Sequence, residues 1–380
     1  MTTTTSLKLP RVAFMGTSGG VSFSRLGFDN ALNRIGSNTG NMIFQSATWE
    51  SIRNPKFLVD FGTNTQWIRE NADVLFLPAA NQVNPMWDLQ DWADFIEAVD
   101  LPTIVVGLGA QSTVESSTSI PLKPGTKRFL SVISERSLNI GVRGAFTAEV
   151  LSKNGINNSV ITGCPSNFTS GNVFGEEIAS KLEDVRSGKF SRTCYVAGTM
   201  EQETRNVEKM LSRLARSECS DSVFQTNAKI LRTIFFKHAD EESYDYFKWE
   251  SAILCPETRT EIYINEVINK GKFYSDARTW IDDAGKYDVV YGMRIHGNIA
   301  AIQGGGLGIC IAFDSRTLEL AQTMGYPYAL ATDILSLERC RLADLGIITN
   351  FSAQEFNSKK LLLKNNLLNI MSSGEIDYLV

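Results

Sequence analysis

Short apolar runs alternate with helical patterns along the whole chain, and this alternation limits the fold more than any other feature. Runs of three or four apolar residues bounded by turn residues are typical of strands, and helical segments between them are typical of βαβ units with parallel sheets. In the first half we expect strands at residues 12–15, 57–60, 74–77, 104–107, 139–142 and 160–162. In the second half we expect strands at residues 194–197, 252–255, 289–291 and 309–312. The pattern therefore predicts an α/β protein.

The length of the chain predicts more than one domain. With 380 residues it exceeds the size at which a single hydrophobic core stops growing. A charged, weakly helical stretch at residues 176–192 separates the two sets of strands. We therefore expect two Rossmann-like domains facing a central cleft, over residues 1–185 and 186–345, and a helical tail over 346–380 that packs back on the first domain. Ligands of such folds bind near the carboxyl ends of the strands, here in the cleft.

Charge and cysteine spacing exclude several classes of protein. The net charge is −5 and the basic residues are scattered, so no nucleic-acid surface is expected. The polar start, residues 1–6, has no apolar signal region, and no apolar run approaches the about 20 residues that cross a bilayer. The six cysteines form no C-x-x-C pair, and no cluster has metal-ligand spacing. We expect a cytoplasmic protein with reduced thiols and no metal site.

The strongest candidate for chemistry follows the strand at residues 288–291. There Arg294, His296 and Gly297 lie in a glycine-flanked turn that leads into a helix rich in small residues. The carboxyl end of a strand beside a helix N-terminus is a place where anions bind. The other of the two histidines, His238, lies in a charged run typical of a surface. We therefore expect Arg294, His296 and Gly297 in the functional site.

The next predicted strand, residues 309–312, ends at Asp314 and Arg316. Asp314 is also well placed to cap the helical run at 316–324, which leaves the role of Arg316 open between ligand and structure. The glycine turn at 304–308 is typical of a loop that ends a helix.

In the first half, a loop before the helical run at 42–47 contains Gly36, Asn38, Gly40 and Asn41. Backbone N–H groups and asparagine amides at a helix start are suited to a polar ligand, so we expect these four residues in the site. The loop is not a phosphate loop of the G-x-x-x-x-G-K-[ST] type, which does not favour an ATPase.

Three further side chains follow predicted strands of the first half. Asn81 and Gln111 end two of these strands, and each belongs either to the cleft or to a tight turn. Arg143 follows the strand at 139–142. An arginine there must reach solvent, a carboxylate or an anionic ligand, because an unpaired buried charge is too costly.

Four segments carry a family resemblance: residues 141–143, 146–151, 162–165 and above all 293–297. With them the chain resembles the polysaccharide pyruvyltransferase family, over most of its length. The resemblance implies a fold similar to the GT-B glycosyltransferases. It implies transfer of the enolpyruvyl group of phosphoenolpyruvate to two hydroxyls of a sugar, giving a pyruvate ketal, without a cofactor. It also implies that Arg143, Arg294 and His296 line the donor site, with the acceptor on the N-terminal side. A lipid-linked acceptor would bring the enzyme to the inner face of the membrane.

The chain departs from the family pattern at two positions. Gly144 stands where many members have an acidic residue, and Cys164 stands in place of the aspartate of a Gly-Asp-Pro turn. The first change removes a partner for Arg143, and the second removes a carboxylate from the turn.

The chemistry of these side chains agrees with such a reaction. Guanidinium groups hold carboxylate and phosphate bidentately, and a protonated imidazole can donate a proton near neutral pH. His296 is the expected proton donor. The base for the second hydroxyl is Asp60, Asp73 or Asp314, among which the sequence does not choose.

Two other functions remain open from the sequence. A glycosyltransferase with a nucleotide-sugar donor could use Glu319 and the turn near Gly306. A non-catalytic relative that binds a sugar or an anion would explain the changes at Gly144 and Cys164, although Arg143, Arg294 and His296 argue against it.

Overall fold

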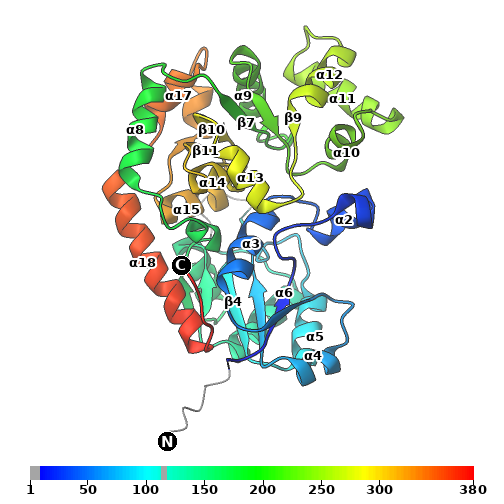
Figure 1. The fold of residues 1–380 in the computed structure, drawn as a ribbon, viewed down its shortest axis with the longest axis vertical. Helices are drawn as coiled ribbons and strands as arrows, with labels where there is room; N and C mark the ends of the chain where they lie inside the picture. Colours follow the sequence, from blue (N-terminus) through cyan, green and yellow to red (C-terminus); the bar gives the residue numbers. More distant parts are fainter. Residues whose placement is uncertain (1–8, 113–117) are drawn as a thin grey trace, which may run out of the picture. The chain divides into compact units, whose positions relative to one another are not determined.

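The computed structural model describes residues 9–112 and 118–380, which form two compact units (Figure 1). Among the described residues, unit 1 holds the chain up to Ser18, Ala47–Pro165 and Leu361–Val380, and unit 2 holds Gly19–Ser46 and Ser166–Lys360. Both units are discontinuous in sequence. This division differs from the linear boundaries expected at residues 185 and 345, because the chain passes from one unit to the other four times.

Unit 1 is built on a parallel six-stranded sheet with the order β2-β1-β3-β4-β5-β6. Its strands are β1 (Val12–Met15), β2 (Lys56–Val59), β3 (Val74–Pro78), β4 (Thr103–Leu108), β5 (Ile140–Val142) and β6 (Ser159–Ile161). Every residue of β1, β3, β4 and β5 is buried. These runs are apolar without alternation because helices cover both faces of a parallel sheet.

The helices of unit 1 include α4 (Thr65–Asn71), α5 (Gln90–Val99), α6 (Pro124–Arg136) and α7 (Ala145–Lys153). Helices α3 (Asn41–Ser51) and α18 (Ala353–Ser373) pass from one unit into the other. The predicted tail is therefore mostly one helix. Its final segment belongs to unit 1, where the backbone N–H of Arg53 donates to the carbonyl of Asp377 at 2.8 Å.

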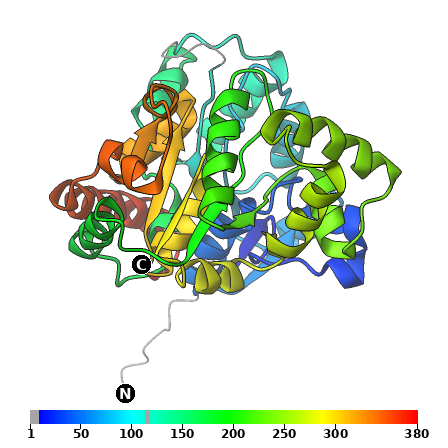
Figure 2. The same cartoon turned by 90° about the horizontal axis from the view of Figure 1, so that it is seen from above.

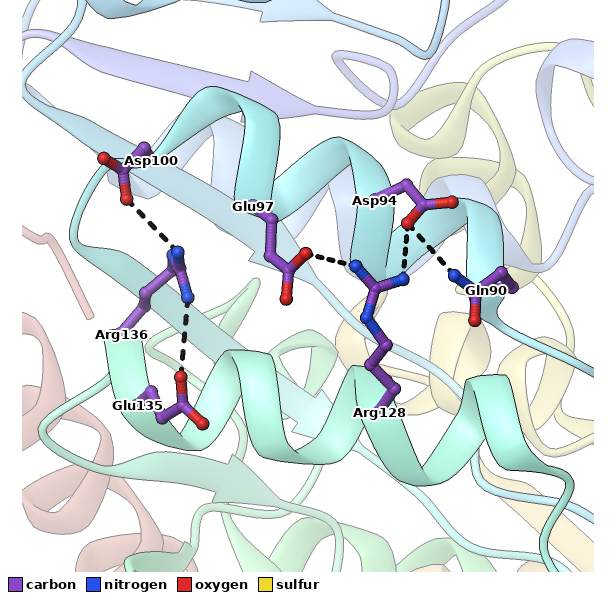
Figure 3. A network of polar contacts seen from close by, with 7 residues as sticks. All are labelled: Gln90, Asp94, Glu97, Asp100, Arg128, Glu135 and Arg136. Atoms are coloured by element: carbon purple, nitrogen blue, oxygen red, sulfur yellow. Dashed lines mark hydrogen bonds and ion pairs between the residues drawn. The ribbon is translucent and has the colours of Figure 1, made fainter.

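Helices α5 and α6 of unit 1 are joined by a network of ion pairs (Figure 3). Arg128 of α6 contacts Asp94 and Glu97 of α5, and Arg136 contacts Asp100 at 3.2 Å. All of these carboxylates are more than a third exposed. Exposed pairs of this kind contribute little to stability.

Unit 2 is built on a second parallel six-stranded sheet with the order β12-β11-β10-β7-β8-β9. Its strands are β7 (Thr193–Val196), β8 (Asp221–Val223), β9 (Gly271–Lys272), β10 (Val289–Gly292), β11 (Gly308–Ala312) and β12 (Tyr328–Leu330). The two sheets confirm the predicted α/β class with two Rossmann-like sheets.

Helices surround the second sheet. Those before β10 are α1 (Phe23–Leu26), α2 (Phe28–Arg34), α8 (Gly175–Arg186), α9 (Arg205–Ser217), α10 (Ala228–Phe236), α11 (Glu241–Leu254), α12 (Thr260–Lys270) and α13 (Ala277–Ala284). Those after it are α14 (Ile295–Gln303), α15 (Ser315–Met324), α16 (Ala331–Leu335) and α17 (Leu342–Ile348), and the 3-10 turn η1 (Pro165–Phe168) lies at the unit boundary. Helices α10, α11 and α12 stand together on one side of the sheet, in yellow-green (Figures 1 and 2).

One predicted strand is wrong. Residues 252–255 form the end of α11 and its C-cap instead of a strand. Asp240 caps the start of that helix by accepting from the backbone N–H of Ser243 at 2.8 Å, so the helix runs straight through the apolar run. A run of four apolar residues does not by itself distinguish a strand from a buried helix end.

Within residues 9–112 and 118–380, no helix is both long enough and apolar enough to span a membrane.

Candidate active site

The strand order of the second sheet reverses between the adjacent strands β7 and β10. From β7 the chain adds β8 and β9 on one side, and from β10 it adds β11 and β12 on the other. The carboxyl ends of two such neighbouring strands leave a crevice, since the loops that follow them turn away in opposite directions. This is the place in unit 2 where a ligand is expected.

Arg294 and His296 follow β10 directly at this point. Arg294 is the N-cap residue of α14, with an extended backbone, and His296 lies in the first turn. Gly292 makes the arrangement possible, because it has φ 150° and a Cβ atom there would lie 2.1 Å from the carbonyl oxygen of Val196 in β7. His296 is 8% exposed, and its ring centroid lies 5.6 Å from that of Phe44.

The loop with Gly36, Asn38, Gly40 and Asn41 lies in the same unit as His296. A Cβ atom on Gly40 would be only 3.3 Å from the Cβ of His296, so the loop and the imidazole are in close contact. The sequence prediction placed this loop in the first domain, whereas the contacts place it beside the residues of the second.

The loop is held in shape by its own amides. Asn38 accepts from the backbone N–H of Gly40 at 2.9 Å, and Asn41 donates to the carbonyl of Ile35 at 2.9 Å. Gly36 adopts φ 63°, a conformation that glycine allows at the end of α2. These contacts give both asparagines a structural role in the loop.

The neighbouring strand end brings Asp314 and Arg316 into the site. Asp314 caps α15 by accepting from the N–H of Thr317 at 2.7 Å, as the sequence predicted. It also forms an ion pair with Arg316 at 3.1 Å. One aspartate thus fixes both the helix start and the guanidinium.

Arg294 has a different environment from the other arginines named here. Its guanidinium donates to the hydroxyl of Thr226 at 3.0 Å, and no described carboxylate forms an ion pair with it. Burial lowers the pKa of Arg294, and the positive charge of Arg316 lowers it further. Two guanidinium groups that repel each other beside the N-termini of α14 and α15 would be stabilised by a bound anion.

In unit 1, Arg143, Asn81 and Gln111 gather at the carboxyl ends of β3, β4 and β5. Arg143 is 2% exposed and donates to the carbonyl of Gly107 at 2.9 Å and to the side-chain oxygen of Asn81 at 2.6 Å. The backbone of Gln111 joins the same cluster, its N–H donating to Val83 at 2.9 Å. These two acceptors are neutral, and they fix the orientation of the guanidinium.

A glycine allows this cluster to form. A Cβ atom on Gly109 would lie 2.7 Å from the side-chain oxygen of Asn81 and 2.8 Å from Cδ of Arg143. Cys164, which stands in the place of the family aspartate, is completely buried.

The three candidates for a base lie in different places. Asp73 forms an ion pair with Arg11 at 3.0 Å before β3, at the end of the sheet opposite Arg143. Asp60 accepts from the N–H of Gly62 and the hydroxyl of Thr63 in the turn after β2. Of the three, Asp314 is the one that lies with Arg316 in unit 2.

Sequence reasoning missed three residues of this region, Glu208, Gln225 and Thr226. Glu208 and Gln225 are 3% and 2% exposed. Glu208 accepts from the N–H of Gly198 at 2.8 Å and from the hydroxyl of Tyr195. Burial raises the pKa of Glu208 to about 7. The sequence did contain a sign that Glu208 is unusual, because this glutamate lies on the apolar face of the amphipathic helix α9 together with Leu211.

Solved structures that are similar to this chain include three that are distant in sequence. UDP-N-acetylglucosamine 2-epimerase from Rickettsia bellii is 10% identical with a TM-score of 0.42, covering 96% of each chain. Alr3699/HepE of Anabaena, in complex with UDP and glucose, is 10% identical with a TM-score of 0.43, covering 96% of this chain and 100% of that one. A glycosyltransferase from Rickettsia africae is 11% identical with a TM-score of 0.38, covering 95% of each chain. No curated protein matches the sequence.

The family model for polysaccharide pyruvyl transferase matches residues 23–315. The match runs through the loop beside His296, the Arg143 cluster and the turn that carries Arg294. Since it covers well over half of the chain, the protein belongs to the polysaccharide pyruvyl transferase family.

Proposed function

We propose that this protein transfers the enolpyruvyl carbons of phosphoenolpyruvate to two hydroxyls of a saccharide, which yields a cyclic pyruvate ketal and inorganic phosphate. The observation that carries the proposal is the pair Arg294 and Arg316 at two adjacent helix N-termini, with His296 in the first turn of one of them. A ligand with a carboxylate and a phosphate close together matches this concentration of positive charge.

The proposed reaction begins with a proton from His296 to the methylene carbon of phosphoenolpyruvate. The first sugar hydroxyl then bonds to the adjacent carbon, and phosphate leaves with the electrons of its C–O bond. The second hydroxyl closes the ring at the same carbon. The two hydroxyls release two protons, of which one restores the proton that His296 gave to the methyl group and the other leaves with phosphate. General acid catalysis of this kind contributes a factor of about 10² to 10⁴.

Arginines hold and stabilise the reacting groups in this scheme. Arg294 and Arg316 bind the phosphate as its negative charge increases during departure. Arg143, which Gly107 and Asn81 hold in place in unit 1, is a further candidate for binding an anionic group of a substrate. Asp314 is the candidate base, since it lies beside Arg316. Phosphoenolpyruvate is a cytoplasmic metabolite, so the proposed site of reaction is the cytoplasm, with a free or membrane-linked saccharide as acceptor.

The test is binding of phosphoenolpyruvate to the purified protein by calorimetry. We expect saturable binding to the parent and a loss of at least tenfold in Arg294→Ala, since a charge-assisted hydrogen bond is worth about 1.5–3 kcal/mol. Arg128→Ala, in the surface network of α5 and α6, is the control and should bind like the parent. Failure of the parent to bind phosphoenolpyruvate, with binding of a UDP- or GDP-sugar instead, would reverse the proposal in favour of a glycosyltransferase.

A further inference from the structure

A cavity of about 790 Å³ lies in unit 2 beside the candidate active site. Its walls come from the ends of β7 and β8 and from helices α9, α11 and α12. Sites for small organic ligands have volumes of roughly 300–1,000 Å³. The cavity is therefore large enough for a sugar residue.

Two residues of the cavity lining each carry a buried polar atom that has no hydrogen-bond partner among the described residues. One is the Oε2 atom of Glu208 and the other is the side-chain N–H₂ of Gln225. An unsatisfied buried polar group costs about 1–3 kcal/mol. A ligand that satisfied both would need to offer a donor and an acceptor to the same region.

The remaining lining of the cavity includes charged side chains, of which Arg216 pairs with Glu257 at 3.6 Å and with Glu266 at 3.2 Å, so part of this charge is compensated. Glu250 accepts from the hydroxyls of Tyr246 and Tyr263 at 2.8 and 3.0 Å, so its oxygens are already satisfied. Burial raises the pKa of both Glu208 and Glu250 to about 7, which reduces the negative charge available to an amine. Serine hydroxyls and tyrosine rings supply further hydrogen-bonding and apolar contacts. A polyhydroxylated ring with apolar faces combines these properties, because each hydroxyl both donates and accepts.

The cavity also borders the anion site. Thr226 lines it and accepts from the guanidinium of Arg294 at 3.0 Å. Gln225 lines it as well, and its N–H₂ nitrogen would be 3.0 Å from a Cβ atom on Gly297. A ligand hydroxyl at this end of the cavity would thus lie next to the groups that bind the donor.

We propose that this cavity binds a saccharide through Glu208 and Gln225 and, resting on the function proposed above, that it is the acceptor site. The acceptor then binds in unit 2, whereas the family resemblance implied an acceptor side in the N-terminal half. The ring hydroxyls form the hydrogen bonds that the side chains of Glu208 and Gln225 lack within the protein. The hydroxyl pair nearest Gln225 is the one that receives the pyruvyl group.

The test is saturation-transfer NMR with the methyl glycosides of glucose, galactose, mannose and N-acetylglucosamine. Ser212→Phe fills the cavity from α9, where Ser212 is 7% exposed and part of the lining. Asn206→Phe places the same side chain at an exposed position of the same helix and is the matched control. We expect transfer to the ring protons of at least one glycoside in the parent and in Asn206→Phe, and at least a fivefold loss in Ser212→Phe.

Gln225→Ala gives a second readout that does not depend on filling the cavity. It removes the unsatisfied donor, leaves the backbone carbonyl that accepts from the N–H of Thr39, and is expected to reduce the transfer at least threefold. The inference is overturned if no glycoside receives transfer from the parent, or if Ser212→Phe and Gln225→Ala both keep the signal of the parent.

Calorimetry with phosphoenolpyruvate on the same samples separates this inference from the proposed function. Ser212→Phe should bind phosphoenolpyruvate within threefold of the parent, because Arg294 and Arg316 are unchanged. Glycoside binding without phosphoenolpyruvate binding would contradict the proposed function and support the saccharide site. Phosphoenolpyruvate binding without glycoside binding would contradict the saccharide site alone.

Discussion

The carboxyl ends of the two sheets each present an arginine, but the two side chains are held in different ways. Arg143 in unit 1 is 2% exposed and donates to a backbone carbonyl and to an amide oxygen, at 2.9 and 2.6 Å. Arg294 in unit 2 donates to one hydroxyl, and the charge of Arg316 opposes its own. The difference indicates that the guanidinium of Arg143 is held in place by its own unit, whereas most of the binding capacity of Arg294 is still available to a ligand.

Removing each arginine and measuring the free energy of unfolding tests this difference most directly. Arg143→Ala removes the hydrogen-bond donor of the Gly107 carbonyl and of the Asn81 side-chain oxygen. Each unsatisfied acceptor costs about 1–3 kcal/mol. We expect a loss of about 2–5 kcal/mol in unfolding free energy by urea denaturation. Arg294→Ala should change stability by less than about 1 kcal/mol, since it also removes repulsion with Arg316.

Equal destabilisation by both substitutions would show that the two arginines are held alike. Arg143→Lys serves as a further control, because it keeps the charge but cannot reach both acceptors with the geometry of a guanidinium. We expect its stability to lie between those of the parent and Arg143→Ala.

A second prediction concerns the pH dependence of unit 2. The pKa of Glu208 is raised to about 7 by burial, above its ordinary value of 4.5. The folded state therefore keeps a proton that the unfolded state releases, and the stability this provides is lost as the pH rises from about 4.5 to about 7. The side chain in Glu208→Gln cannot titrate, so the Tm of this variant minus that of the parent should increase from pH 5 to pH 8. The increase corresponds to up to about 3 kcal/mol of unfolding free energy.

The control for this prediction is Glu203→Gln, at an exposed position of the loop before the same helix. Its Tm difference from the parent should not vary between pH 5 and pH 8. A Glu208→Gln difference that is equally constant would mean that the buried carboxyl does not titrate in this range.

The smallest expected effect concerns the arginines of the surface network. Arg128 pairs with Asp94 and Glu97, which are 54% and 38% exposed in their side chains (Figure 3). Arg128→Ala should cost no more than about 1 kcal/mol, and the cost should shrink as salt is added. A cost above that of Arg143→Ala would overturn the view that neutral buried acceptors hold an arginine more strongly than exposed carboxylates.

Local sequence patterns predicted most of the fold. Strands such as β3 and β10 were recognisable because a buried parallel strand is a short apolar run between turns. The strands β8, β9 and β12 were missed because Asp221–Val223, Gly271–Lys272 and Tyr328–Leu330 are short and only partly buried. Residues 252–255 were assigned wrongly because the end of α11 has the composition of a strand.

The candidate site was predictable only where its residues are neighbours in the chain. Arg294 and His296 could be found because a strand, a turn and a helix follow one another there. The contact of Gly40 with His296, and that of Thr226 with Arg294, join segments far apart in sequence. A single sequence carries no signal for such contacts, so Gln225 and Thr226 could not be found from it.

The discontinuity of the two units also determines how the protein can be synthesised. The sheet of unit 1 is translated first, yet its unit includes Leu361–Val380, where Asp377 donates its N–H to Asn54 at 2.8 Å. A nascent chain on the ribosome therefore holds an unfinished unit 1 throughout the synthesis of unit 2. The contacts of unit 1 with Leu361–Val380 can form only after unit 2 has been synthesised, so the surfaces of unit 1 that these residues cover are exposed during translation.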